Sequence, residues 1–319
     1  MGYKILTHIG VALGHQKLGN DYYIEQIDEA NRERTRHFLE DVMGRNIRYI
    51  ADAEQTSLSL AIEASKQAII ENKVNVDDID MVICISHTPE YSSPTMARLV
   101  LESFNGKDTV NCLDMNVNCT GMLVALDMAD RYFRTDESIK NILVVEGDRH
   151  SAFDTEKTSP FFGCIGDIGC AVILERDDER GIQSRHFIMD RTMAMNIVYP
   201  KNGYSKPERI LYTDPKLDAR VELGAKLIEE KLGQEKMDKM KLVCMSQFAY
   251  INCKKYIEMS QIEEEKVPYI GDKYGYTGAS SPILALKQGI EEGKLKRGDS
   301  FLLWTYGAGT QHVILEMKY

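Results

Sequence analysis

An internal repeat of one strand-and-helix pattern limits the folds open to this sequence more than any other feature. The segment 78–86 (DIDMVICIS) resembles the segment 238–246 (DKMKLVCMS), which lies 160 residues further along the chain. Each runs from a helix end into a short apolar stretch that stops at a polar residue, so we expect a buried strand in both. A single match of this kind can arise by chance, because buried strands are generally rich in Val, Ile and Leu.

Further matches follow in the same order in both parts of the chain. In each part a Thr-Gly pair opens an apolar helical run, a strand-like run follows it, and a second strand-like run closes the pattern. Such alternation is typical of layered α/β proteins, and its repetition predicts two duplicated α/β halves. The matching members are Thr120-Gly121 with Thr277-Gly278, 141–147 with 300–307, and 171–175 with 313–316.

We divide the chain into an N-terminal half, 1–174, and a C-terminal half, 175–319. The segment 181–223 is rich in Arg, Lys, Tyr and Pro and has weak periodicity, so we interpret it as a long connection that opens the second half. In α/β folds ligands bind beyond the C-terminal ends of the strands. The strand ends expected to converge on one site are 116–119, Ser86-His87, Ser246-Gln247, Tyr276 and 306–309.

One cysteine lies both at such a strand end and at the start of a helix. Asn118-Cys119-Thr120-Gly121 follows the strand-like run 109–115 and opens the apolar run 122–126. Unpaired N–H groups and the helix dipole favour a negative charge at a helix start, which makes a thiol there more nucleophilic. Most free cysteines simply pack in the core. The position among converging strand ends nevertheless predicts that Cys119 is a nucleophile.

Composition argues against several other classes of protein. The 319 residues are 43% hydrophobic, enough for a sizeable core, and the net charge of −10 disfavours nucleic acid or an anionic membrane as the main partner. No apolar stretch approaches the roughly 18 residues that a membrane span needs. Seven irregularly spaced cysteines predict reduced thiols in a cytoplasmic protein. Without Cys-x-x-Cys or His-x-x-x-His patterns, we predict no metal site.

These motifs resemble β-ketoacyl-acyl carrier protein synthase III and its relatives in the thiolase superfamily, over nearly the whole chain. The resemblance implies a duplicated, five-layered αβαβα sandwich, which agrees with the repeat, and a homodimer packed through the edge of one half. The most specific pieces are 114–121 (DMNVNCTG, family pattern D-x-x-x-x-C-[AST]-G), 166–171 (GDIGCA), 274–281 (YGYTGASS) and 306–309 (YGAG).

The resemblance also implies a chemistry. In the family an acyl group moves from a thioester to the active-site cysteine, here Cys119, and a carbanion made by decarboxylating a malonyl thioester then forms a carbon–carbon bond. The backbone N–H groups of Cys119 and Ala308 would form the oxyanion hole. No tightly bound cofactor is implied, because the acyl donor is a thioester of acyl carrier protein or coenzyme A.

Two functional positions of the family are replaced. The family's histidine falls on Ser246, in 245–249 (MSQFA), and its asparagine falls on Tyr276. In the family these side chains hydrogen-bond the malonyl thioester carbonyl and stabilise the enolate, and losing one such donor costs on the order of 10²- to 10³-fold in rate. Because serine is no base near neutral pH and tyrosine is bulkier than asparagine, the two changes indicate a repurposed site.

The coenzyme A entrance differs as well. The family's Trp and first Arg in this region fall on Phe38 and Val42, in the run that ends at Gly44. The loss of these contacts favours an acyl group carried by a carrier protein over coenzyme A. Carrier proteins are acidic, so a local basic patch is required, and its candidates are Lys201, Lys206, Arg209 and Lys216.

Other histidines of the chain are candidates to replace the missing base. His87 and His150 follow strands and could serve, although an ordinary loop histidine is about three times the more frequent case. His312 begins the last strand and is expected to pack.

We therefore predict a synthase III-like acyltransferase that forms an acyl-Cys119 thioester and passes the acyl group to a second substrate without malonyl decarboxylation. The pathway would be the biosynthesis of fatty acids, polyketides or other secondary metabolites. One alternative is an active decarboxylative synthase with a substituted base. The other is a non-catalytic subunit of a synthase heterodimer. The expected partners are an acyl thioester, an acyl carrier protein and a second subunit, identical or different.

Overall fold

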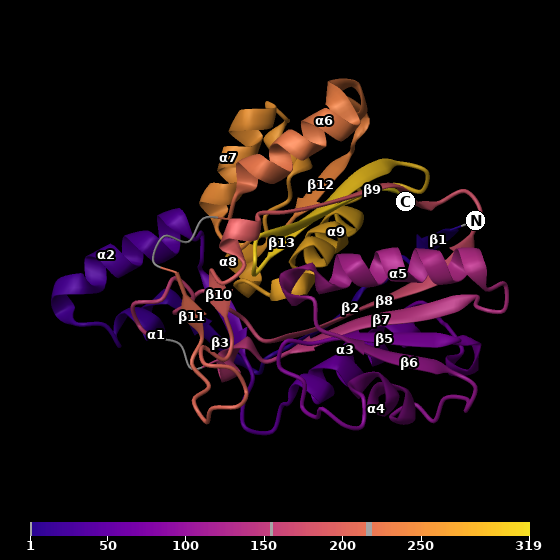
Figure 1. Cartoon of the computed structure of the whole chain (residues 1–319), viewed down its shortest axis with the longest axis horizontal. Coiled ribbons are helices and arrows are strands. Elements are labelled where there is room, and N and C mark those ends of the chain that lie inside the picture. Colours follow the sequence, from indigo (N-terminus) through magenta and orange to yellow (C-terminus); the bar gives the residue numbers. More distant parts are fainter. Residues whose placement is uncertain (1, 154–155, 215–218) are drawn as a thin grey trace.

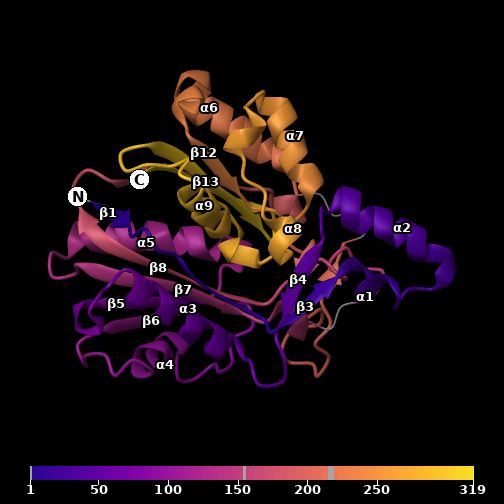
Figure 2. The ribbon, with the colours of Figure 1, turned by 180° about the vertical axis from the view of Figure 1, so that it is seen from behind.

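The computed structural model describes residues 2–153, 156–214 and 219–319. Figures 1 and 2 show two sheets that separate three layers of helices, which confirms the expected five-layered αβαβα sandwich. In Figure 1, α6 and α7 lie above the second sheet, α5 and α9 lie between the sheets, and α3 and α4 lie below the first sheet. These helices are α3 (Ser57–Glu71), α4 (Met96–Glu102), α5 (Gly121–Thr135), α6 (Val221–Lys239), α7 (Tyr250–Ser260) and α9 (Ser281–Glu291).

The first sheet has the strand order β1-β8-β7-β5-β6, with β2 also paired to β8. Strand β5 runs parallel to both β6 and β7, whereas β7 and β8 are antiparallel. The strands are β1 (Gly2–Ile5), β2 (Gly10–Leu13), β5 (Met81–Ile85), β6 (Asn111–Met115), β7 (Asn141–Asp148) and β8 (Ile168–Asp177).

The second sheet has the order β12-β13-β14-β9, with β12 parallel to β13 and the other neighbours antiparallel. Its strands are β9 (Gly181–Met189), β12 (Leu242–Met245), β13 (Ser300–Gly307) and β14 (Gln311–Lys318). The succession β5, α5, β7, β8 in the first sheet thus recurs as β12, α9, β13, β14 in the second. Every strand and helix expected from the repeat is present. The division between residues 174 and 175 stays a prediction; the chain passes from the first sheet to the second between Asp177 and Gly181.

One expectation is wrong in part. The segment 181–223 is not wholly a connection, because its first nine residues form β9, which pairs with β14 at the edge of the second sheet. Much of β9 is polar and only half-buried, as in Ser184 to His186, so it lacks the apolar alternation that marks a strand. Beyond it, β10 (Ile197–Val198) and β11 (Tyr212–Thr213) form a small ribbon.

The remaining elements lie at the side of the sandwich, at the left of Figure 1. Strands β3 and β4 pair there as an antiparallel ribbon, and α8 lies close to β4. Their bounds are β3 (Gln16–Gly19), β4 (Ile47–Ile50), α1 (Asn20–Ile24), α2 (Arg32–His37) and α8 (Gly271–Tyr274).

The core explains why the central strands read as unbroken apolar runs. On β5, Met81, Ile83 and Ile85 face the cluster around α5 and α9, and Val82 and Cys84 face the cluster around α3 and α4. A strand covered by helices on both faces needs apolar residues at every position. Among the described residues, no helix is long and apolar enough to cross a membrane.

Candidate active site

Cys119 lies in a single 3₁₀ turn, Asn118–Thr120, which joins β6 to the start of α5. Asn118 has a left-handed backbone with φ of 52°. The next helix can start close to β5 only because residue 121 is glycine, since a Cβ there would lie 2.4 Å from Ile85 Cγ2. The hydroxyl of Thr305, on β13, donates a hydrogen bond of 2.7 Å to the Cys119 carbonyl. The thiol is therefore placed by elements of both sheets.

The turn after β13 approaches Cys119 closely. A Cβ on Gly307 would lie 3.2 Å from the Cys119 backbone nitrogen and 3.4 Å from its Cβ. The following residue, Ala308, lines the same two pockets as Cys119. The structure thus brings together the two residues expected to supply the oxyanion hole, and that role stays a prediction.

Two adjoining pockets open at Cys119, with volumes of about 120 and 40 Å³. Both are lined by Phe161, Ile197 and Tyr276 as well as Cys119 and Ala308. Further aromatic side chains, Phe153, Tyr199 and Tyr204, line the larger pocket. Apolar walls around a thiol suit the hydrocarbon part of an acyl group.

Ser246 and Tyr276 lie together beside this thiol. Both are buried, and their hydroxyl oxygens are 3.4 Å apart. The Tyr276 ring meets Phe248 edge-on at 5.3 Å. Burial, and then the negative charge of a Cys119 thiolate, raise the pKa of Tyr276 well above its usual value, so its phenol stays protonated. The side chains of Ser246 and Tyr276 therefore contact each other beside the thiol, and their correspondence to the family's histidine and asparagine stays a prediction.

A histidine from another strand end also reaches the pocket. His87 follows β5 and lines the larger pocket with Cys119. Its Nδ1 lies 2.6 Å from Asp148 Oδ2, and its backbone N–H donates to Asp148 Oδ1 at 2.7 Å. Burial alone would lower the pKa of His87, but the charge of Asp148 and its hydrogen bond, with a smaller contribution from Cys119, hold that pKa well above its usual value. The imidazolium form is favoured.

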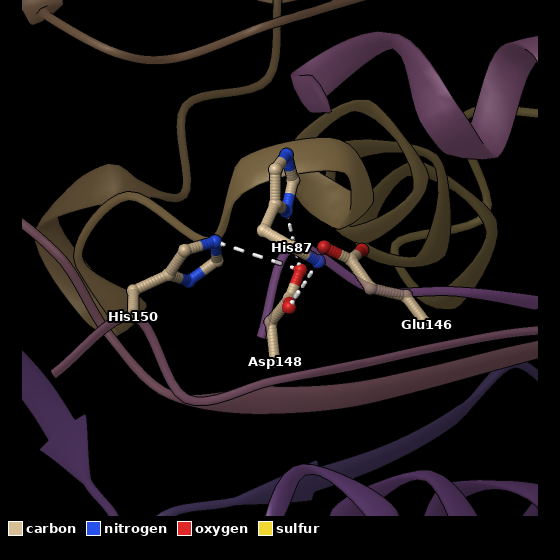
Figure 3. Close-up of side chains that lie close together, drawn as sticks. All are labelled: His87, Glu146, Asp148 and His150. Carbon is tan, nitrogen blue, oxygen red and sulfur yellow. Dashed lines mark hydrogen bonds and ion pairs between the residues drawn. The ribbon is translucent and has the colours of Figure 1, made fainter. Parts of the chain in front are cut away.

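His87 belongs to a buried cluster with Glu146, Asp148 and His150, in which the polar atoms point toward one another (Figure 3). His150 Nδ1 lies 3.0 Å from the Gly166 carbonyl oxygen, and its Nε2 lies 3.6 Å from Asp148 Oδ2. Glu146 Oε1 accepts a hydrogen bond of 3.2 Å from the backbone N–H of Ala279. Sequence reasoning missed both carboxylates. The available signal was their spacing of two residues at the end of an apolar strand, which places both on one face.

The cluster offers ligand types that bind metal ions, with one ligand atom from each residue all within 4.8 Å of one another. The 2.6 Å between His87 Nδ1 and Asp148 Oδ2 is, however, a hydrogen-bond distance. Two ligands on a tetrahedral zinc ion lie about 3.4 Å apart, given bonds of about 2.1 Å. As they lie, these residues fit the sharing of protons and not the coordination of an ion.

The two carboxyl groups of the cluster differ in protonation. Burial and the neighbouring charge of Asp148 raise the pKa of Glu146 well above its usual value. Burial also opposes ionisation of Asp148, but the charges and hydrogen bond of the neighbouring histidines outweigh it and hold that pKa below its usual range. Asp148 is therefore the anion and Glu146 the neutral acid.

The other candidates lie further from the thiol. Phe38 and Val42 pack on a small apolar cluster around Leu39 and Met43. His312 is buried and accepts a hydrogen bond of 3.2 Å from Trp304 Nε1, so the prediction that it packs is confirmed.

The proposed basic patch is only partly described. Arg209 stacks its guanidinium on the ring of Tyr204 at 5.1 Å, Lys201 lies over the ring of Tyr212 at 5.6 Å, and Lys206 is exposed. Lys216 lies outside the described residues.

Fold and site together define a protein of the thiolase-like class with a cysteine at the junction of its two halves. The chain belongs to the β-ketoacyl-acyl carrier protein synthase III family. The family description "3-oxoacyl-[acyl-carrier-protein] synthase III" matches residues 113–191, and that of its C-terminal part matches residues 232–318.

Individual relatives agree along the whole chain. The β-ketoacyl-[acyl-carrier-protein] synthase III of Aquifex aeolicus is 30% identical over 325 residues, covering 100% of both chains. The enzyme of the same name from Bartonella henselae is 28% identical over 327 residues, covering 96% of both. The crystal structure of the Aquifex aeolicus protein superimposes with a TM-score of 0.86 at 25% identity and covers 100% of both chains.

Proposed function

We propose that this protein is a synthase III-like acyltransferase in which Cys119 takes an acyl group from a thioester and passes it to a second substrate. The observation that carries the proposal is the position of Cys119, on a turn between β6 and α5, against Gly307-Ala308 and in the lining of a mainly apolar pocket. A thiol held there can attack a thioester carbonyl while nearby backbone N–H groups stabilise the oxyanion.

We further propose that malonyl decarboxylation has been lost. Decarboxylation needs donors aimed at the carbonyl where the enolate forms. At the two positions of the family's donors, Ser246 and Tyr276 have their hydroxyl oxygens 3.4 Å apart, and both side chains are buried. The Tyr276 ring also occupies more of the pocket than an asparagine would. This contact supports a site that transfers an acyl group without making a carbanion.

The proposed donor is an acyl group on acyl carrier protein, with coenzyme A thioesters as the other candidate. The curated relatives are named for the carrier protein. Phe38 and Val42 pack on an apolar cluster, which offers a nucleotide neither a basic nor an indole contact. We also propose no tightly bound cofactor, a homodimer or a heterodimer with another synthase, a cytoplasmic location, and a role in fatty acid, polyketide or other secondary-metabolite synthesis.

Intact-protein mass spectrometry after incubation with acyl-carrier-protein and acyl-coenzyme A thioesters tests the proposal. We expect an acyl adduct on the wild type that Cys119→Ala abolishes. The matched control is Cys112→Ala, because Cys112 and Cys119 are the cysteines that are not fully buried, and it should keep the adduct. If donors spanning short and long chains give no adduct, the proposal is wrong.

Incubation with a malonyl thioester distinguishes the proposed acyltransferase from a decarboxylative synthase. We expect no carbon dioxide release from it. Release together with a β-keto product would replace our proposal by the decarboxylative synthase. A protein that forms no adduct and co-purifies with a second synthase-like chain would be the non-catalytic subunit.

A further inference from the structure

We propose that His87, held by Asp148, is the general acid–base partner of Cys119. It would serve in place of the histidine that the family carries at the position of Ser246. This inference rests on the proposed acyl transfer, because only a nucleophilic Cys119 needs such a partner.

The orientation of the His87 imidazole supports this role. Asp148 is a carboxylate and can only accept, so His87 Nδ1, 2.6 Å from Asp148 Oδ2, must carry a hydrogen. Nε2 is then the nitrogen free to exchange a proton. In Figure 3 it lies on the side of the ring away from Asp148. It is buried and has no hydrogen-bond partner among the described residues, and Cys119 lines the same pocket.

Asp148 is itself held in place by several hydrogen-bond donors. Its Oδ1 accepts hydrogen bonds from the Ser86 hydroxyl at 2.9 Å and from the backbone N–H groups of His87 and Thr88 at 2.7 and 3.0 Å. The Thr88 hydroxyl donates a further bond of 3.0 Å. A carboxylate with this many donors stays ionised and fixed, which is what orients a catalytic imidazole.

Within the same cluster, the hydrogen-bond partners of His150 differ from those of His87. Both nitrogens of His150 face the protein, Nδ1 toward the Gly166 carbonyl and Nε2 toward Asp148. The Nδ1 of His150 is therefore engaged by a backbone carbonyl, and its Nε2 lies 3.6 Å from the carboxylate that already holds His87. Glu146 is neutral and adds no competing charge. Within the buried cluster, His87 faces Asp148, Glu146 and His150. In the pocket it faces Cys119, and the neutral phenol of Tyr276 lies beside that thiol.

The internal repeat also relates His87 to the family's histidine position. The segment 78–86 corresponds to 238–246, so Ser86 corresponds to Ser246 and His87 to Gln247. Strands β5 and β12 end on the same side of the molecule, at the site around Cys119. The imidazole therefore stands one residue past the repeat-related equivalent of the family's histidine position. It approaches the thiol from the first sheet instead of the second.

The chemistry balances with these groups alone. In the resting site the proton is on His87 and the Cys119 sulfur is anionic. The sulfur attacks the thioester carbonyl carbon, the bond to the donor's sulfur breaks, and His87 gives its Nε2 proton to that leaving thiolate. In the second half, neutral His87 takes the proton of the acceptor's nucleophilic group as it attacks acyl-Cys119. The Cys119 sulfur leaves as an anion and the original pair returns.

The test is the rate at which iodoacetamide alkylates Cys119 as a function of pH, with the modified peptide identified by mass spectrometry. We expect the wild type to react readily below pH 7. In His87→Gln the rise should move to higher pH, toward the value of about 8.5 for an ordinary cysteine, and the rate at pH 7 should fall about tenfold or more. Asp148→Asn should show a smaller change in the same direction.

The matched control is His15→Gln. His15 Nδ1 lies 2.7 Å from Asp52 Oδ2 in an exposed pair of the same type, and His15 lines neither pocket that opens at Cys119, so its loss should leave the profile unchanged. A wild type that reacts only like an ordinary cysteine would overturn the inference without any variant. So would a folded His87→Gln protein with the wild-type profile.

Alkylation needs no acyl donor, so the two proposals fail separately. If His87→Gln slows alkylation but no thioester acylates Cys119, the His87 pairing stands and the proposed function fails. If Cys119 is acylated at the same rate in wild type and His87→Gln, the proposed function stands and this inference fails.

Discussion

Glu146 and Asp148 show how strongly single hydrogen bonds decide the chemistry of a buried residue. The two carboxyl groups stand two residues apart on β7 and both are fully buried. Asp148 receives several donors, including two backbone N–H groups, whereas Glu146 receives the N–H of Ala279 and faces the Asp148 charge. Asp148 is therefore an anion that can orient a histidine, and Glu146 is a neutral carboxylic acid.

Replacing Glu146 with glutamine should stabilise the protein above pH 4.5. A carboxyl group with a raised pKa must take up a proton on folding at any pH between its ordinary value, 4.5, and its folded value. Wild-type stability falls with pH over that window by up to about 1.4 kcal/mol per pH unit, and Glu146→Gln removes the cost. Urea unfolding from pH 5 to 8 should show a stabilisation that grows with pH. Glu63→Gln, at an exposed position, is the control. A Glu146→Gln protein less stable than wild type at pH 8 would show that Glu146 is ionised.

The predictability of the site differs from residue to residue. Cys119 could be predicted because a strand end and a helix start coincide in sequence at 118–121. The sequence marks His87 as a candidate base but does not favour it over His150. Its orientation and charge depend on Asp148, which lies 61 residues away along the chain. Nothing in the sequence tells a carboxylate that will be surrounded by donors from one that will not.

At the scale of elements, the internal repeat predicted the central strands and helices of both halves, which local composition alone does not. β5, α5, β7 and β8 and their counterparts were expected because helices cover both faces of the sheets and force continuous apolar runs. β9 was missed because an edge strand with polar, half-buried residues has no such signature. Its place is set by hydrogen bonds to β14, which are contacts between distant parts of the chain.

The hairpin of β13 and β14 contains a buried histidine that should make stability depend on pH. Burial lowers the pKa of His312 from 6.5 to about 4, and Trp304 Nε1 donates to its ring. Between pH 6.5 and pH 4, His312 is protonated in the unfolded chain but not in the folded protein. Its contribution to the free energy of unfolding is therefore complete above pH 6.5 and is lost as pH falls toward 4. The loss should reach about 3 kcal/mol.

The difference in unfolding free energy between wild type and His312→Gln measures this term. Between pH 7 and pH 4 it should shift by up to about 3 kcal/mol in favour of the variant, because glutamine can accept from Trp304 but does not titrate. His8→Gln, at an exposed position, should track the wild type. A constant difference across this range would show that the pKa of His312 is the same in the folded protein as in the unfolded chain.

At the scale of the whole molecule, the two halves are joined around the site by a buried cation. Arg45 lies just before β4 and is fully buried. It donates to the carbonyl of Cys164, which precedes β8, and to the carbonyls of Gln247 and Phe248, which follow β12. Because the Phe248 ring contacts Tyr276, this guanidinium connects the joint between the sheets to the wall of the pocket.

Arg45→Met should therefore damage both stability and the site. The change fills similar volume but leaves two buried carbonyls and one partly buried carbonyl without their donor. Each buried group left unpaired costs about 1 to 3 kcal/mol, so we expect a loss of at least about 2 kcal/mol in urea unfolding. Arg45→Lys should recover only part of it, because one ammonium cannot reproduce the planar fork of the guanidinium. Arg34→Met, on the exposed face of α2, should cost little. Acylation of Cys119 should slow in Arg45→Met at temperatures where it remains folded, because Phe248 and Tyr276 lose their fixed positions. If Arg45→Met unfolds within about 1 kcal/mol of wild type, Arg45 is not what holds the two halves together around the site.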